Sequence, residues 1–277
     1  MQDAILDAIM DSLKLLPFLF LTYLLMEYLE HKTSEKSKNA IKKSGKYGPV
    51  IGSILGAVPQ CGFSVSATNL YAGRVITLGT LIAIYLSTSD EMLPILISSG
   101  TNIGLIIEIL IVKILIGMIS GIAIDLIYKN KNKQEEHIHD LCENEHCHCE
   151  EGILKSSIIH TLQIFAFILI ASMILNTALY FIGEDNISKF ILNKPILAPI
   201  LACLIGLIPN CASSVVLTKI YTGGIIGIGT LIGGLLVNSG LGLMILFKVN
   251  KNLKENIKIV SILYIIGVIS GIIIEII

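Results

Sequence analysis

Two short stretches of the sequence combine a proline, a carboxamide, a thiol and hydroxyl groups at the same spacing. Pro59 to Val65 reads Pro-Gln-Cys-Gly-Phe-Ser-Val, and Pro209 to Val215 reads Pro-Asn-Cys-Ala-Ser-Ser-Val. Thiolates bind soft ions such as Cu(I), zinc and trivalent arsenic, whereas Mn²⁺ and Mg²⁺ prefer oxygen ligands. These residue types therefore predict a site for a soft metal or metalloid. Its candidate ligands are Gln60, Cys61, Ser64, Thr68, Asn210, Cys211, Ser214 and Thr218.

A polar segment between the two stretches holds a second set of metal ligands. Four of the six histidines and three of the six cysteines lie within 13 residues. Imidazole and thiolate groups this close can meet on one ion, although their spacing matches no standard zinc finger. We interpret the segment as a flexible metal-capture loop, and a merely solvated acidic linker is the alternative. The ligands are His137, His139, Cys142, His146, Cys147, His148 and Cys149.

The two proline-cysteine stretches belong to an internal repeat with a spacing of 150 residues. Between Pro59 and Ile82, 12 of 24 positions are identical to their partners, against roughly one in ten expected by chance in a chain of this composition. The match continues to the other end of the unit, where Gly117–Asp125 aligns with Gly267–Glu275. The repeat predicts three regions. They are residues 1–128, a linker over 129–152, and residues 153–277.

The composition is that of an integral membrane protein. Of 277 residues, 53% are hydrophobic and only 15% are charged, and the mean hydropathy is +0.80, which is too apolar for a soluble domain. The net charge is −1 and no basic patch with interleaved aromatics occurs, which excludes nucleic acid as a partner. The expected partners are the lipid bilayer and a metal or metalloid ion, and the sequence leaves room for a homo-oligomer.

Each half of the chain contains five apolar runs, some of them shorter than a full membrane span. Because five is odd, tandem copies should face opposite ways across the bilayer. The predicted fold is an all-α membrane protein with about ten transmembrane or partly spanning helices in two inverted-topology five-element repeats. The runs are residues 13–29, 50–70, 73–87, 92–99 and 102–128, then 156–182, 196–220, 224–237, 241–247 and 257–277.

The lysines indicate how the chain is oriented. Lysines gather after the first run of the first half and before the last run of the second half. Basic loops lie in the cytoplasm, so loops 30–47, 129–155 and 248–258 are predicted to be cytoplasmic. Both termini and Arg74 are then expected outside, in a multi-pass protein of the plasma membrane.

The prolines predict where a polar site lies in depth. Pro59 and Pro209 interrupt apolar runs, and broken backbone at membrane depth is tolerated where it is buried in protein or lines a polar cavity. Matched breaks in inverted halves are typical of a transporter's binding site. We therefore expect Cys61 and Cys211 to face each other across a cavity. The alternative is that they fill close helix crossings, the role predicted for Cys203.

A few ionisable residues lie in or near the ends of the apolar runs. Such residues are functional candidates because charge is costly in a bilayer. Glu108 is the candidate proton carrier, or it simply neutralises Lys113, five residues further on. Asp125 and Glu275 lie near the ends of their runs and are expected to be solvated anchors.

The motifs also carry a resemblance. The two proline-cysteine stretches, the Ser-Thr-Ser-Asp-Glu-Met-Leu-Pro segment from Ser87 to Pro94 and the His-Ile-His-Asp-Leu-Cys segment from His137 to Cys142 resemble the ten-helix heavy-metal exporter family. The resemblance covers essentially the whole chain. Members of that family are labelled arsenic efflux proteins or manganese transporters. The resemblance implies export of a metal or metalloid from the cytoplasm.

Taken together, the residues and the resemblance predict a secondary transporter that works by alternating access, with the metal as cargo and no cofactor. Cys61 and Cys211 would be the central ligands, and the His/Cys loop would gather cargo. One alternative is a manganese transporter with oxygen ligands from Asp90, Glu91, Gln60, Asn210 and Asn238. Another is a membrane metal sensor. An enzyme is not predicted, because the chain has no Gly-x-Ser-x-Gly or His-Glu-x-x-His motif.

Overall fold

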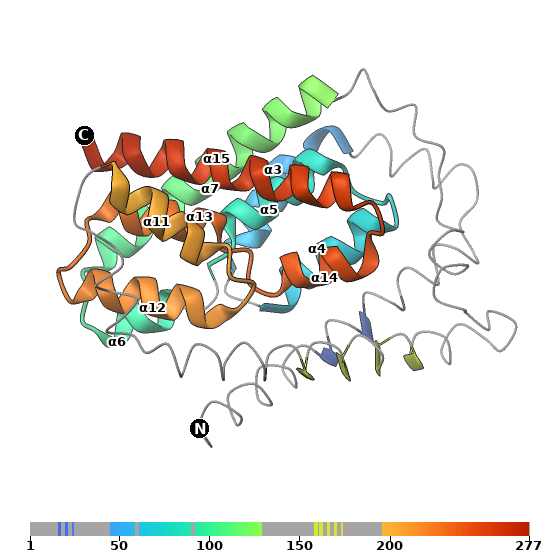
Figure 1. The fold of residues 1–277 in the computed structure, drawn as a ribbon, viewed down its shortest axis with the longest axis horizontal. Coiled ribbons are helices and arrows are strands. Elements are labelled where there is room, and N and C mark those ends of the chain that lie inside the picture. Colours follow the sequence, from blue (N-terminus) through green and yellow to red (C-terminus); the bar gives the residue numbers. More distant parts are fainter. Residues whose placement is uncertain are drawn as a thin grey trace, which may run out of the picture.

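The computed structural model of the chain describes residues 45–58, 61–89, 92–128 and 196–276, and isolated positions between residues 16 and 24 and between 158 and 173. All regular structure in these ranges is helical, as the composition predicts. The first half contains η1 (Gly45–Tyr47), α3 (Gly48–Gly56), α4 (Cys61–Ala72), α5 (Leu78–Ser87), α6 (Met92–Ser98) and α7 (Ile103–Tyr128). The second half contains α11 (Leu197–Gly206), α12 (Cys211–Thr222), α13 (Ile228–Val237), α14 (Gly242–Val249) and α15 (Leu253–Ile276) (Figure 1).

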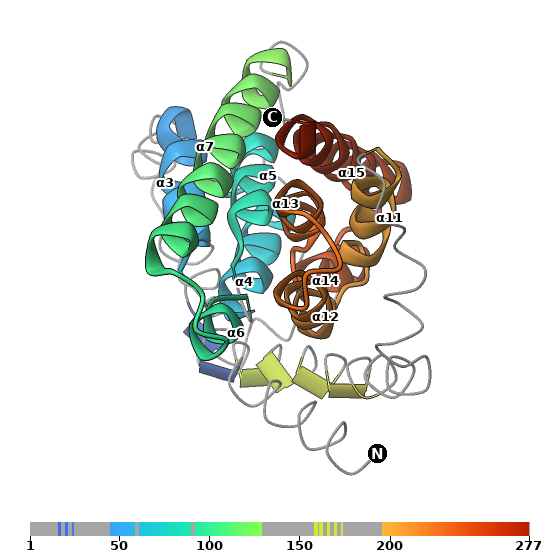
Figure 2. The same ribbon diagram turned by 90° about the vertical axis from the view of Figure 1, so that its left-hand side faces the viewer.

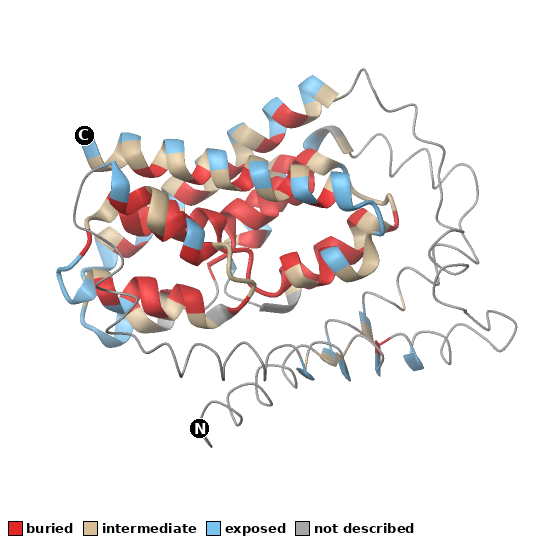
Figure 3. Cartoon of the chain, viewed as in Figure 1, coloured by how far each residue is buried: buried red, intermediate tan, exposed pale blue. Residues whose placement is uncertain are grey.

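The helix boundaries follow the sequence repeat. Helices α4, α5, α6 and α7 begin at residues 61, 78, 92 and 103, and α12, α13, α14 and α15 begin at residues 211, 228, 242 and 253. Helices α5 and α13 lie side by side in the centre, with α7 and α3 on one side and α15 and α11 on the other (Figure 2). Almost all residues of the two central helices are buried (Figure 3).

Each half also packs one of its helices against the other half. Helix α4 of the first half packs on α14 of the second, and α12 of the second half packs on α6 of the first. The two contacts are equivalent under the repeat, so the halves form one interlocked unit.

The run over residues 50–70 does not cross the molecule, because the chain turns back between α3 and α4. Helix α3 lies along α5 in parallel, since a methyl group at Gly48 would meet Thr80 and one at Gly56 would meet Ser87. Helix α4 ends only a few residues before α5 starts, so α3 begins and α4 ends at the same end of the molecule. Arg74, which follows α4, contacts Glu255 of α15. The expectation that Arg74 lies opposite loop 248–258 is therefore wrong.

The long helices α7 and α15 have the length and composition of membrane spans, with a mean hydropathy of 2.5 each. The adjoining helices α13 and α14, taken together as Ile228–Val249, also qualify. Tyr128 at the end of α7 lies against Lys258 near the start of α15, so these two helices run in opposite directions. Within an apolar stretch of 18 residues in each helix, only 22% is buried inside the protein. The outer faces of both helices are therefore available to lipid.

Glycines allow each long helix to pack closely on a central helix. A methyl group added at Gly121 of α7 would lie 2.5 Å from the carbonyl oxygen of Gly79 on α5, and one added at Gly271 of α15 would lie 3.0 Å from that of Gly229 on α13. Each is the second glycine of a Gly-x-x-x-Gly pair. This pattern lets helix backbones approach in membranes, which explains why the repeat retains it.

A carboxylate follows each glycine pair and caps the neighbouring helix. Asp125 accepts hydrogen bonds from the backbone nitrogen of Gly79 at 2.9 Å and the hydroxyl of Thr77 at 2.7 Å. Glu275 accepts one from the backbone nitrogen of Thr230 at 2.6 Å. Carboxylates are stabilising at helix N-termini. Asp125 and Glu275, which are both partly exposed, therefore cap the neighbouring helices, a role that the sequence analysis did not predict.

Candidate functional site

The interrupted helices meet in the middle of the molecule around a small cavity with polar and apolar side chains in its wall. Helix α5 ends and α6 begins beside the point where α13 ends and α14 begins (Figure 1). The cavity has a volume of about 10 Å³, which is room for about one water-sized sphere. Both halves contribute to its wall, with Thr88, Ser89 and Met92 from the first and Ser214, Leu235 and Asn238 from the second.

The polar groups at the second-half break are buried and partly satisfied by one another. The Asn238 side-chain nitrogen donates to the Ser213 hydroxyl at 3.0 Å, and the Asn238 side-chain oxygen accepts from the Gly240 backbone nitrogen at 2.8 Å. The Ser239 side chain is 1% exposed, and its hydroxyl has no hydrogen-bond partner among the described residues. Buried polar groups normally have partners, so the Ser239 hydroxyl is available to bond to a ligand or a water molecule.

A buried lysine bonds to one of the residues that line the cavity. Lys113 of α7 is fully buried, and its ammonium group donates a hydrogen bond to the carbonyl oxygen of Thr88. The equivalent residue of the second half is Leu263, so the charge is present in one half only. An ionisable residue within a membrane span is a functional candidate because burying charge is costly. Glu108 lies on the exposed face of α7, and both of its suggested roles, as a proton carrier and as a neutralising partner of Lys113, stay predictions.

Among the predicted ligands with described side chains, Ser214 lies in the cavity wall. Thr68 and Thr218 are buried, and each donates to the carbonyl oxygen one turn earlier, that of Ser64 or Ser214, at 2.7 Å. The Thr68 hydroxyl also lies 2.5 Å from the Tyr85 hydroxyl and 3.2 Å from the Gly242 carbonyl oxygen. It therefore connects α4 to α5 and α14.

Asn210 has a helix-capping role, and Ser64 has a packing role. The Asn210 side-chain oxygen accepts from the backbone nitrogen of Ala212 at 3.1 Å, which caps α12. Ser64 is fully buried, and its Cβ lies 3.1 Å from the position of a methyl group added at Gly242. Pro209 lies half-buried in the turn before α12. The Asn210 carboxamide, in the turn between α11 and α12, is thus used for capping.

Several predicted residues lie outside the described part of the chain. Cys61 and Cys211 are the first residues of α4 and α12, but their side chains are outside the description, as are Pro59 and Gln60. The loop ligands His137, His139, Cys142, His146, Cys147, His148 and Cys149 also lie outside it. Within the described residues, no three His, Cys, Asp or Glu side chains come together as a metal site.

The prediction for Cys203 is confirmed. This residue is fully buried, and its sulfur lies 3.4 Å and 3.3 Å from the positions of methyl groups added at Gly233 and Gly267. It fills the crossing of α11, α13 and α15.

Sequence reasoning missed four residues at the cavity. Thr88, Ser89, Met92 and Lys113 were not among the predicted ligands, although three of them line the cavity and the fourth bonds to its wall. A signal was present, because Ser87-Thr88-Ser89 aligns with Val237-Asn238-Ser239. Both copies therefore have a polar interruption after the third element.

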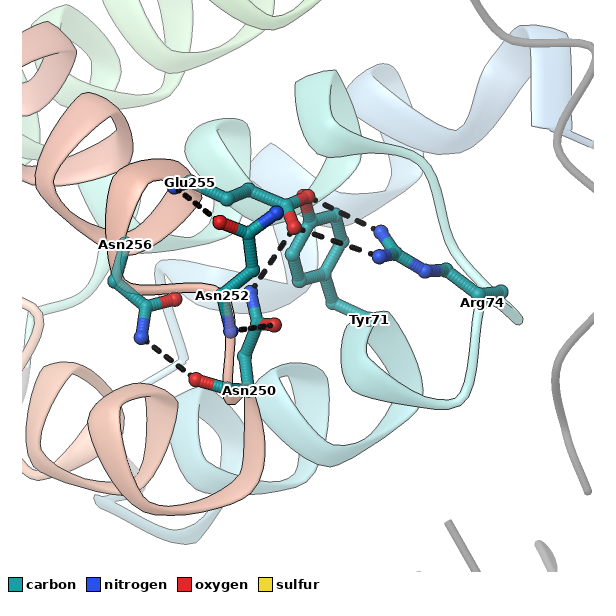
Figure 4. Close-up of polar contacts among 6 residues, drawn as sticks. All are labelled: Tyr71, Arg74, Asn250, Asn252, Glu255 and Asn256. Carbon is teal, nitrogen blue, oxygen red and sulfur yellow. Dashed lines mark hydrogen bonds and ion pairs between the residues drawn. The ribbon is translucent and has the colours of Figure 1, made fainter. Parts of the chain in front are cut away.

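A second polar cluster joins the two halves at one end of the molecule (Figure 4). The Arg74 guanidinium donates to the two carboxylate oxygens of Glu255 at 3.1 and 3.4 Å. Tyr71 donates its hydroxyl proton to the same carboxylate, and the Asn250 side chain donates at 3.2 Å. Burial lowers the pKa of Arg74, but the hydrogen bond and charge of Glu255 outweigh it, so the pKa lies above its ordinary value.

The backbone of Arg74 is held in the left-handed region, with φ at 58°. Its equivalent in the second half is Gly224, with φ at 72°. A residue with a side chain is disfavoured in this conformation, whereas glycine adopts it readily. An arginine at this position therefore indicates that its side-chain contacts offset the backbone strain.

Comparison with known proteins gives one family. The family described as "Putative, 10TM heavy-metal exporter" matches residues 1–184 and residues 135–253. No curated protein and no solved structure matches the chain.

Proposed function

The chain belongs to the ten-helix heavy-metal exporter family, and on this premise we propose that it carries a soft, thiol-binding ion out of the cytoplasm through the cavity between its halves. The family is one of transporters and not of enzymes. A multi-pass membrane protein agrees with the apolar helices.

One observation carries the proposal, namely that equivalent breaks from the two halves, after α5 and after α13, line one small cavity that holds both polar and apolar side chains. Thr88 and Ser89 come from the break between α5 and α6, and Asn238 comes from the break between α13 and α14. Irregular backbone at membrane depth is tolerated where it lines such a site. Interrupted helices at a repeat interface are where secondary transporters bind their ions. The cavity volume of about 10 Å³ suits a single ion stripped of most of its water.

The donors available near the breaks favour a soft ion. Cys61 and Cys211 begin the helices that carry Ser64 and Ser214, and Ser214 lines the cavity. Met92 also lines it, and thiolates and thioethers select soft metals. In this proposal the cysteines are the principal ligands, with Gln60, Asn210, Ser64 and Ser214 in support.

Manganese is the second candidate cargo, because the remaining described polar groups on the cavity wall are hydroxyls and one carboxamide. Mn²⁺ prefers oxygen ligands. Under this reading Asn238, together with Asp90 and Glu91, which lie outside the described residues, would replace the thiols as ligands.

We infer the orientation of the protein in the membrane from the charges at the two ends of the molecule. Arg74, Lys254 and Lys258 share one end, whereas segments 98–104 and 222–227 carry no charged residue. Basic segments lie in the cytoplasm, so we place the first group inside. The opposite directions of α7 and α15 support an inverted repeat. The His/Cys loop follows α7 at the cytoplasmic end, where it would deliver cargo.

Transport by inside-out vesicles tests the proposal. Vesicles holding the wild type would be given arsenite, methylarsenite, Zn²⁺ or Mn²⁺, and cargo accumulation would be measured. We expect a thiophilic cargo to accumulate and the variant Cys61→Ser plus Cys211→Ser to lose at least about 10-fold in rate, the effect of about 1.4 kcal/mol. A loop lacking residues 137–149 should lower uptake mainly at low cargo concentration.

Cys203→Ala is the matched control, because its thiol is buried in a helix crossing, and its rate should stay near that of the wild type. Normal manganese transport by the double serine variant, with no movement of any thiophilic cargo, would replace the soft-ion proposal with the manganese one. A wild type that moves none of the four ions would favour a sensor.

A further inference from the structure

A larger cavity lies at the end of the molecule where the two halves are joined by Arg74 and Glu255. Its volume is about 440 Å³. It opens between the end of α4, the end of α7 and the first turns of α15. We propose that this cavity binds a phosphate group, carried by an anionic phospholipid or by free phosphate, which is a function separate from metal transport.

The charge on the cavity wall is positive. Arg74, Lys254 and Lys258 line it, and Glu255 is the one carboxylate among its lining residues. The Glu255 oxygens already accept from Arg74, Tyr71 and Asn250. Two ammonium groups therefore remain over the cavity without a carboxylate partner among the described residues.

The two lysines are placed to act together. Lys254 and Lys258 are four residues apart on α15, so their side chains leave the same face of the helix. The Lys258 ammonium lies 3.7 Å from the centre of the Tyr128 ring, which holds it at the cavity by a cation–π contact. A phosphate group with two or three free oxygens can accept from both ammonium groups at once.

The apolar part of the wall indicates which source of phosphate fits better. Ile76, Leu78 and Ile259 line the cavity beside the cations. An apolar wall next to cations, at the end of membrane-length helices, suits the glycerol and upper acyl chain of a lipid. Free phosphate would gain nothing from these side chains. The lipid headgroup is therefore the expected source.

At the opposite end of the molecule, the equivalent described positions lack these cations. The positions equivalent to Lys254, Glu255 and Lys258 are Gly104, Leu105 and Glu108, and Gly224 replaces Arg74. The repeat therefore supplies the same backbone at both ends but the cations at only one. This is the end expected to face the anionic cytoplasmic leaflet.

Native mass spectrometry of the purified full-length protein tests the inference. The protein would be titrated with phosphatidylglycerol, with phosphatidylcholine, or with inorganic phosphate. The cavity variant is Lys254→Gln plus Lys258→Gln, and Lys254→Arg plus Lys258→Arg keeps the charge. The matched control is Lys248→Gln plus Lys251→Gln, which removes the same charge from the same end without touching the cavity wall.

We expect phosphatidylglycerol to bind more tightly than phosphatidylcholine. The cavity variant should lose about 25-fold in affinity, from a factor of about five for each lysine, whereas the arginine variant and the control should lose far less. Inorganic phosphate that binds with the same dependence on Lys254 and Lys258, and displaces the lipid, would identify free phosphate as the source. Equal losses in the cavity and control variants, or no preference for either phosphate-bearing anion, would overturn the inference.

Discussion

Two contributions of Arg74 to stability can be measured separately. One is the strain of its left-handed backbone, and the other is its ion pair with Glu255. Arg74 adopts φ of 58°, and its guanidinium pairs with Glu255 across the two halves at 3.1 Å. The perturbations are Arg74→Ala, Arg74→Gly, Glu255→Gln and the combinations of each arginine variant with Glu255→Gln. Both Arg74 variants remove the ion pair, but only glycine relieves the backbone.

The expected magnitudes follow from burial and conformation. The Arg74 and Glu255 side chains are 27% and 19% exposed, so the pair is stronger than a surface pair of about 0.2–1 kcal/mol. Hydrogen bonds to charged groups contribute about 1.5–3 kcal/mol. We therefore expect a coupling energy of about 1–2 kcal/mol between Arg74 and Glu255. Relief of the left-handed backbone is worth about 1 kcal/mol, so Arg74→Gly should be more stable than Arg74→Ala by that amount.

The measurement is the free energy of unfolding of the full-length protein in mixed detergent micelles, analysed as a double-mutant cycle. Lys254→Gln is the matched control, because it removes a cation next to Glu255 that makes no described ion pair, and it should change stability by less than about 0.5 kcal/mol. A coupling energy below about 0.3 kcal/mol, or an alanine variant as stable as the glycine variant, would refute the reasoning.

Two further predictions concern packing and the buried lysine. Gly229→Ala should destabilise the protein by about 3 kcal/mol or prevent folding, because the added methyl would lie 2.3 Å from the Glu275 backbone nitrogen. Gly45→Ala is the control, because its added methyl has its nearest contact at 3.8 Å. Thermal unfolding should show no change for this control. Lys113→Leu should fold with a nearly unchanged melting temperature, since Leu263 occupies the equivalent position, but vesicle transport should fall at least about 10-fold. Transport at the wild-type rate would make the lysine purely structural.

Much of the local structure is encoded in short stretches of the sequence. The 150-residue repeat predicts helices in matching places, and those of α4 to α7 and α12 to α15 start at matching residues, because helix hydrogen bonds and breaks depend on near neighbours. Membrane character follows in the same way from composition, since each long helix needs lipid to cover its outer face. The glycine pairs and the carboxylates after them were visible in the alignment of the two halves, but their purpose was not.

The path of the chain at each break was decided only by tertiary packing. Residues 50–70 have the length of a span, and Pro59 predicts that the run is interrupted. That α4 then turns back and packs on α14 of the other half is seen only in the tertiary structure. The same packing brings Thr88 to Asn238 and Arg74 to Glu255. The polar groups at each break bond largely within their own half, as Thr88 does to Ile84 and Asn238 to Ser213. Only the packing of the two halves places both breaks against one cavity, because each half supplies one part of the cavity wall.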